Sequence, residues 1–125
     1  MVTQAGVIEL NKLFCGDTAD EFLYIAYGTG TTAEAKTQTA LVTETARVSA
    51  KTQIESSSAG HDTMVFFAMA YPRVAGTVAE IGVFNAATAG DMLVRKKLST
   101  AVTYTAGQRL YLVVYVTVKD NNWET

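Results

Sequence analysis

Two side chains could carry nucleophilic or metal chemistry, the lone imidazole of His61 and the lone thiol of Cys15. A catalytic triad needs a nucleophile, a base and a group that orients the base, and zinc sites combine several His or Cys ligands. His61 lies in the segment 58–62, where glycine and aspartate favour a turn, so we expect an exposed turn histidine. Cys15 ends a short apolar helix, far from the positive helix terminus that acidifies thiols, so we expect a buried structural thiol. The sequence therefore predicts no catalytic residue, no metal site and no cofactor.

The carboxylates offer little more chemistry than the histidine. The acidic residues of 17–21 fall in a predicted helix-to-strand connection, where they keep a turn solvated and are poor candidates for glycoside hydrolysis. Glu80 is different, because it interrupts the apolar segment 78–84. A carboxylate at such a position either faces solvent or pairs with a cation. We predict a structural ion pair, with Arg95 or Arg73 as the partner.

Gly28 and Gly30 follow an apolar segment, as the glycines of phosphate-binding loops do. The resemblance ends there, because no Lys-Ser/Thr pair stands at the required spacing and no third glycine opens a helix. We expect a tight turn. The formal net charge of −2 also argues against a polyanionic partner, which would need a concentrated basic surface. The sequence predicts neither nucleic acid nor a small-molecule substrate as a ligand.

The N-terminal residues show no sign of a targeting segment. The chain begins MVTQAG, without a basic region or a long apolar core, and no stretch approaches the ~20 apolar residues that cross a bilayer. We expect synthesis in the host cytoplasm without a signal peptide, and no membrane partner.

The elements that would position any site are mostly strands. One short helix is predicted between Val2 and Gly16, with Thr3 as its cap and Gly16 as its end. Its apolar face, expected to cover a sheet, holds Val7, Leu10, Leu13 and Phe14. Strands are predicted at 21–27, 63–71, 77–85, 92–99 and 109–119. Residues 31–39 read as a loop, and the weakly alternating 41–55 as a twisted edge strand or an extended arm.

Short strands joined by polar, glycine-bearing turns favour an antiparallel arrangement, since parallel strands need helical crossovers. The predicted fold is mainly β, an antiparallel β-sandwich of jelly-roll-like type with one short N-terminal helix. We expect a single β-rich domain over 1–125, with an extended arm or loop at 29–60. The strand at 63–71 is apolar on both faces, so it is expected to be buried on both sides.

The strand at 109–119 also carries two apolar faces. One face is expected to anchor the core against Met64, Phe66 and Phe84, and consists of Leu110, Leu112, Val114, Val116 and Val118. The opposite face carries Tyr111, Val113, Tyr115 and Thr117, which is too apolar for open water. Either the N-terminal helix or a neighbouring subunit should cover it. The candidate subunit-contact residues are Tyr111, Val113, Tyr115 and Trp123.

Five short segments, taken in order, resemble elements of small structural modules of tailed bacteriophages. They are the helix from Thr3 to Leu10, and four segments similar to "GTGTT", "TALxxE", "EIGLFN" and "MLAR" elements, at 27–32, 39–44, 80–85 and 92–95. The resemblance spans Thr3 to Thr117. It implies a non-enzymatic virion component of a tail fibre, collar or baseplate that contacts other virion proteins. It also implies a homo-oligomer, with a trimer favoured because modules of this kind commonly gather around three-fold axes.

Two other roles stay open at the level of sequence. A module without a fibre shaft could decorate a capsid, joining neighbouring shell subunits. A module that binds carbohydrate or a host surface could use several aromatic residues if they share an exposed face, namely Tyr24, Tyr27, Tyr104, Tyr111, Tyr115 and Trp123.

Overall fold

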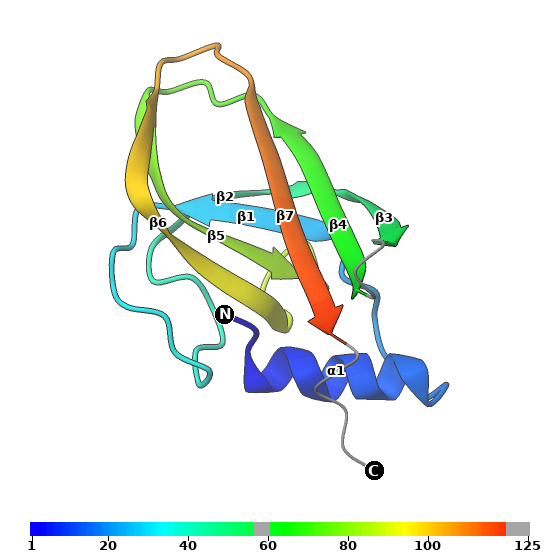
Figure 1. Cartoon of the computed structure of the whole chain (residues 1–125). Helices are drawn as coiled ribbons and strands as arrows, with labels where there is room; N and C mark the ends of the chain where they lie inside the picture. The colour runs from blue at the N-terminus through cyan, green and yellow to red at the C-terminus, as the bar shows by residue number, and fades with distance from the viewer. Residues whose placement is uncertain (57–60, 120–125) are drawn as a thin grey trace.

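The computed structural model describes residues 1–56 and 61–119, and at 55–56, 61–62 and 118–119 the backbone alone. It contains two antiparallel sheets and one helix in a sandwich-like arrangement (Figure 1), which confirms the predicted fold class. The elements are α1 (Gln4–Phe14), β1 (Tyr24–Gly28), β2 (Glu44–Ser49), β3 (Lys51–Ser56), β4 (His61–Ala70), β5 (Gly76–Phe84), β6 (Met92–Tyr104) and β7 (Leu110–Lys119). β1 begins later than predicted, and β6 continues five residues beyond its predicted end at 99.

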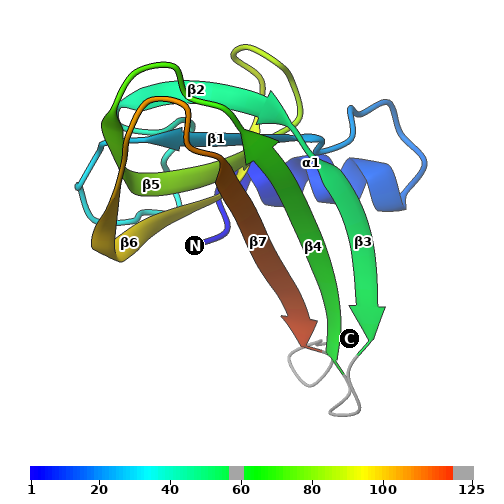
Figure 2. The same cartoon turned by 90° about the horizontal axis from the view of Figure 1, so that it is seen from above.

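The four-stranded sheet has the order β2-β1-β5-β6, and the three-stranded sheet the order β3-β4-β7. β2 and β3 follow each other with only Ala50 between them, so the chain leaves the edge of one sheet and becomes the edge of the other (Figure 2). The Ala50 N–H donates to the Leu23 carbonyl at 2.7 Å, which fixes this corner. The segment 41–55, predicted as one edge strand or an arm, therefore supplies two edge strands.

The helix begins and ends where the sequence predicts. The Thr3 hydroxyl oxygen accepts a hydrogen bond from the Gly6 N–H at 2.9 Å, and Gly16 follows the helix with a φ of 71°. Gly6 lies against β6, where a Cβ would stand 2.6 Å from the Leu93 Cα. Only a residue without a side chain permits so close an approach of helix to strand.

The predicted apolar face of α1 is only half correct. Leu10 and Leu13 pack against the core, but Val7 and Phe14 are 46 % and 74 % exposed. The reason is the position of the helix, which lies across one end of the two sheets and covers neither sheet face (Figure 1). Within the described part of the chain, no helix is both long and apolar enough to span a bilayer.

The main core lies between the sheets. Leu112 and Val116 are buried there and Leu110 and Val114 pack against them, which confirms the predicted inner face of β7 at these four residues; the side chain of Val118 lies outside the described part of the chain. Phe84 was expected beside them, and this expectation is wrong. It belongs instead to a second cluster, on the other side of the four-stranded sheet, formed by Ala26, Leu41, Phe84 and Met92. The register of β5 against β6 shifts between Val78 and Glu80, so Phe84 faces the opposite side from the one that regular alternation starting at Val78 would give.

The expectation that β4 is buried on both sides is also wrong. Phe66 and Ala70 are buried toward the other sheet, whereas Phe67 and Met69 on the opposite face are 38 % and 39 % exposed. Successive strand residues point to opposite faces, and no element of the described chain lies over the outer face of β4.

Candidate functional site

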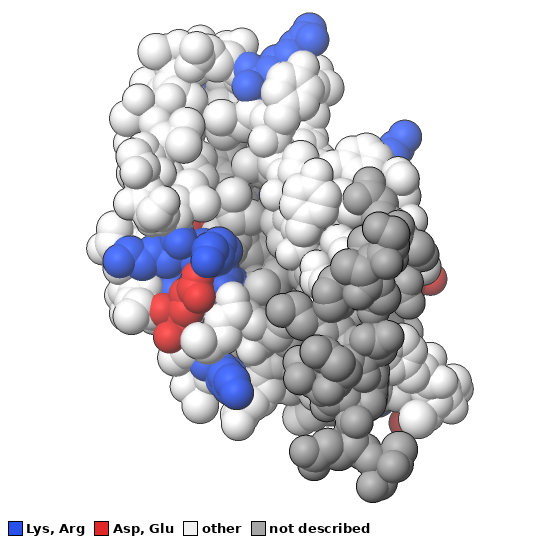
Figure 3. Space-filling model, viewed as in Figure 1, with Lys and Arg blue, Asp and Glu red and all other residues white. Residues whose placement is uncertain are grey.

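The outer face of the three-stranded sheet presents a continuous apolar surface. Phe67 and Met69 of β4 lie opposite Val113 and Tyr111 of β7, and Tyr115 continues the row. We call these five residues the open face; their exposed fractions are 38, 39, 45, 70 and 64 % in that order. Figure 3 shows this side of the molecule as a largely white area over β4 and β7, with Lys and Arg side chains at its margins.

A shallow groove of about 580 Å³ runs along the open face. Besides the five residues it is lined by Ser49, Lys51, Gln53, Val65 and Ala68, so lysine is the one charged residue among the described lining side chains. The surface continues to Tyr71, which is 56 % exposed and carries the Arg109 guanidinium 5.5 Å from its ring centroid. The site is therefore apolar and aromatic at its centre and basic at its edge.

The structure brings three of the four sequence-predicted contact residues together on the open face, namely Tyr111, Val113 and Tyr115. The helix does not cover them, since α1 packs on β6 at the end of the sandwich. Trp123 lies outside the described residues. Phe67 and Met69 were missed, because apolar residues on both faces of β4 were taken to mean burial on both sides. Phe67 and Met69 can be identified from the pairing of β4 with β7, because both strands carry apolar residues on both faces.

The outer face of the four-stranded sheet is covered, in contrast, by the loop 29–43. Glu80 holds this loop through its fully buried carboxylate. Its Oε1 accepts from the N–H groups of Gly30 at 3.0 Å and Thr43 at 2.7 Å, and its Oε2 from the N–H of Val42 at 3.0 Å and the Arg95 Nε at 2.7 Å. The predicted ion pair of Glu80 with Arg95 is confirmed.

Burial alone would oppose ionisation of Glu80. The hydrogen bonds from Thr43, Arg95, Val42 and Gly30 outweigh that penalty, so the pKa of this carboxyl lies below its ordinary value. The carboxylate is therefore charged at neutral pH and engaged by four donors. Such a group stabilises a loop and is poorly placed to react with a ligand.

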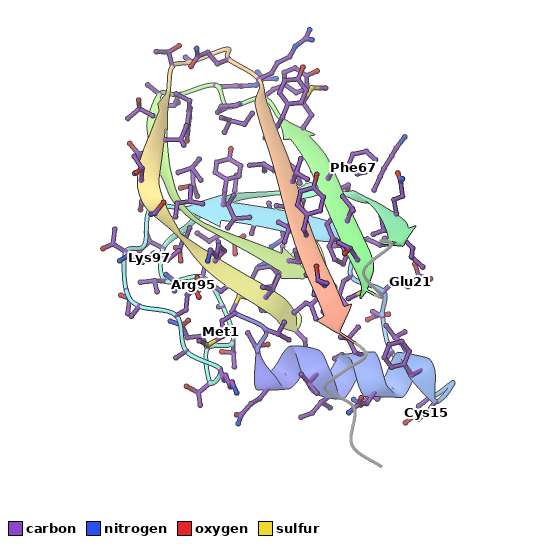
Figure 4. All side chains as sticks on the ribbon, in the orientation of Figure 1. Met1, Cys15, Glu21, Phe67, Arg95 and Lys97 are labelled. Carbon is purple, nitrogen blue, oxygen red and sulfur yellow. The ribbon has the colours of Figure 1, made fainter. Side chains whose placement is uncertain are left out.

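Gly30, from the glycine motif at 27–32, lies directly against this carboxylate. A Cβ on Gly30 would stand 2.5 Å from the Glu80 Oε1, so the close approach depends on glycine. Arg95, labelled in Figure 4, also donates from Nη1 to the Thr32 carbonyl at 2.9 Å. We call Glu80 and the four residues that donate to it, Gly30, Val42, Thr43 and Arg95, the Glu80 cradle. The four segments that follow the helix in the phage resemblance meet at this cradle and at the Phe84 cluster beside it.

The residues considered for catalysis do not converge. Cys15 is exposed, so the expected buried thiol is wrong; it lies at the end of α1 that projects beyond the sheets (Figure 4). His61 is the first residue of β4, and the turn predicted around it falls mainly outside the described residues. No group of three His, Cys, Asp or Glu residues in the described chain could hold a metal ion together.

Comparison with known proteins identifies a family. The family model described as podophage GP4 fiber I protein gp80 matches residues 10–116, from the middle of α1 to the main part of β7. No curated protein matches the chain. Because the match covers most of the sequence and both sheets, the chain belongs to the podophage GP4 fibre I protein gp80 family and is a structural component of a tailed-phage virion.

Proposed function

We propose that the chain is a non-enzymatic module of a phage fibre, and that it joins neighbouring virion subunits through the open face. The observation that carries this proposal is the exposure of Phe67, Met69, Tyr111, Val113 and Tyr115 on one sheet surface. At about 200 Å² for each large side chain, their exposed fractions amount to roughly 500 Å² of apolar surface.

An apolar area of this size favours a macromolecular partner. The largest patch on an ordinary monomer is about 300–600 Å² and often functional. A stable protein interface buries about 800 Å² on each partner, so the open face supplies more than half of one. We propose that the partners are other virion proteins, including further copies of this chain in a homo-oligomer, with a trimer favoured.

The fibre is the favoured location because the matched family is described as a fibre protein. Collar, baseplate and capsid decoration roles would use the same open face against a different neighbour. Imaging of particles that carry a label on this chain separates these locations, since a fibre module places the label on a tail appendage and a decoration protein places it on the head.

A carbohydrate-binding role is the second candidate. Tyr27 and Tyr104 are unsuitable, since they are buried and their rings pack edge to face at 6.3 Å. Tyr111 and Tyr115 are exposed on one face beside the polar Gln53, an arrangement that could stack sugars. Retention of the purified protein on host-surface glycans, lost on Tyr115→Ala, would favour this role over subunit contact.

The decisive experiment replaces Tyr115 by Asp. A charge at a 64 % exposed position should leave the domain folded, but it should abolish assembly and incorporation into particles. Val102→Asp is the matched control, because Val102 is also an exposed apolar strand residue, at 52 %, and lies on the other sheet. Circular dichroism with size-exclusion chromatography makes the comparison. Normal assembly of folded Tyr115→Asp would remove the open face as the contact surface.

A further inference from the structure

Some charged side chains of the described chain form ion pairs with one another, and others do not. Ion pairs within the described chain join Glu9 to Lys12, Glu34 to Lys96, Glu44 to Arg47 and Glu80 to Arg95. Two groups of like charge form no ion pair with another described residue: the acids Asp17, Asp20 and Glu21, and the bases Lys51, Arg73 and Arg109. Lys36, Asp91 and Lys97 also form no ion pair with another described residue; they belong to the loop 29–43, the turn before β6 and β6 itself.

The acids flank a second exposed apolar surface. Phe14, the last residue of α1, is 74 % exposed, and Leu23 just before β1 is 37 % exposed. Together with Asp17, Asp20 and Glu21 they form what we call the acidic tip. A groove of about 390 Å³ adjoins it and is lined by Glu21, Leu23 and residues of β3 and β4. In Figure 4 Cys15 lies at the end of α1, and Glu21 lies near β3, between Cys15 and Phe67.

The bases border the open face. Lys51 lines its groove, Arg109 lies over the neighbouring Tyr71, and Arg73 follows that tyrosine after one proline. Among the described side chains that line the groove, none is a carboxylate. The chain therefore carries two apolar surfaces of opposite charge. Lys12 lies near Asp17, and the other acids and bases of the two surfaces form no ion pair within the described residues.

We infer that the acidic tip of one copy docks on the open face of the next copy, with Phe14 seated in the apolar groove. This inference rests on the proposed function and names the partner surface for it. Contact of two open faces would bring Lys51, Arg73 and Arg109 of both copies together, and like charges across an interface are unfavourable. Contact of tip with face places acids beside bases. Because the two surfaces differ, the contact is head to tail and can close a ring of copies.

Charge reversal tests the pairing. The tip-reversed variant is Asp20→Lys with Glu21→Lys, and the face-reversed variant is Lys51→Glu with Arg109→Glu. Each alone should weaken self-association at low salt by about tenfold or more, since both of its surfaces then carry the same sign. A variant that carries both reversals should assemble again, because its tip and its face are once more opposite in sign whatever the number of copies in the ring. Lys36→Glu with Lys97→Glu is the matched control and should assemble like the wild type.

Sedimentation velocity over a range of protein and salt concentrations gives the result, with circular dichroism to show that each variant is folded. Wild-type assembly should weaken as salt is raised, because rim charges are screened. Phe14→Ala should also weaken assembly without changing the fold.

The inference is overturned if folded tip-reversed protein assembles like the wild type, if the folded variant with both reversals fails to assemble, or if the wild type stays monomeric at low salt. In each case loss of particle incorporation by Tyr115→Asp would still support the open face as a contact surface. The two proposals therefore fail separately.

Discussion

Two phenylalanines on the outer faces of the two sheets have opposite surroundings. Phe84, on the four-stranded sheet, is 1 % exposed beneath the loop 29–43 and the Arg47 guanidinium, which lies 3.7 Å from its ring centroid. Phe67, on the three-stranded sheet, is 38 % exposed. The same kind of surface is thus covered by the chain itself in one sheet and left uncovered in the other.

The difference between the two faces shows that a loop covering a sheet needs hydrogen-bond acceptors for its buried backbone. Loop backbone carries N–H groups that need acceptors once they are buried. Glu80 supplies acceptors for three of them, and Arg95 neutralises the carboxylate from the next strand. The open face has no such polar anchor among its five residues. The covered face therefore belongs to the stability of the fold, and the open face is available to a partner.

The largest loss of stability is expected at Glu80, which anchors the loop 29–43 over the four-stranded sheet. Glu80→Ala leaves the 1 % exposed Arg95 without its counter-ion and three loop N–H groups without an acceptor, so we expect a loss of about 3–5 kcal/mol in the free energy of unfolding. Asp20→Ala is the control: its exposed carboxylate forms no ion pair with another described residue, so the loss should be below about 1 kcal/mol. Urea titration followed by circular dichroism measures both, and equal losses would contradict the anchoring role.

The two phenylalanines give the most direct comparison. Phe84→Ala should cost about 3–5 kcal/mol, since it empties a buried site. Phe67→Ala should cost the isolated chain about 1 kcal/mol or less, because that ring is already partly in water. In assembled protein Phe67→Ala should lower the association constant. If the isolated Phe67→Ala domain proves as unstable as Phe84→Ala, the distinction between the faces is lost.

Acid should weaken the covered face selectively. The folded-state pKa of Glu80 is lowered, so its stabilising contribution is complete above the unfolded-state pKa of about 4.3 and is lost as pH falls through the folded value. The Glu80→Gln protein does not titrate at this position. The difference in unfolding free energy between wild type and Glu80→Gln should therefore shrink as pH is lowered from neutrality, and a constant difference down to acid unfolding would contradict this assignment.

The smallest loss of stability is expected at Arg47, which covers the Phe84 ring. Arg47 stacks on Phe84 and donates from Nη1 to the carbonyls of Ala86 and Ala89, both at 2.8 Å. Arg47→Lys keeps the charge but loses this geometry, and we expect a loss of about 1 kcal/mol in a thermal unfolding experiment. A loss as large as that of Phe84→Ala would mean that the guanidinium, more than the ring, holds the cluster together.

Local patterns predicted the elements well. The cap at Thr3, the stop at Gly16 and the two faces of β7 could be identified because short-range spacing determines them. The ion pair of Glu80 could also be predicted, because a carboxylate inside an apolar strand needs a cation. The remaining donors to Glu80 could not be predicted, since they come from residues 30 and 42–43 and depend on tertiary structure.

The errors have a common physical cause. Cys15, Phe14 and Phe67 were assigned to the interior because apolar residues usually lie there, but a pattern of apolar residues does not distinguish a core from a surface reserved for another molecule. The predicted contact residues Tyr111, Val113 and Tyr115 were placed on one face by strand alternation alone. Their neighbours on β4 required knowledge of which strands pair.

The Glu80 cradle also bears on how the chain is made. Its parts come from residues 30, 42–43, 80 and 95, so the loop 29–43 leaves the ribosome long before its anchor exists. Until Arg95 has emerged, a charged Glu80 would enter apolar surroundings without its counter-ion, and the loop cannot close over the sheet. The nascent chain therefore exposes the outer surface of the four-stranded sheet until Arg95 is available. Released chains truncated before residue 95 should therefore aggregate more than released chains truncated after β6.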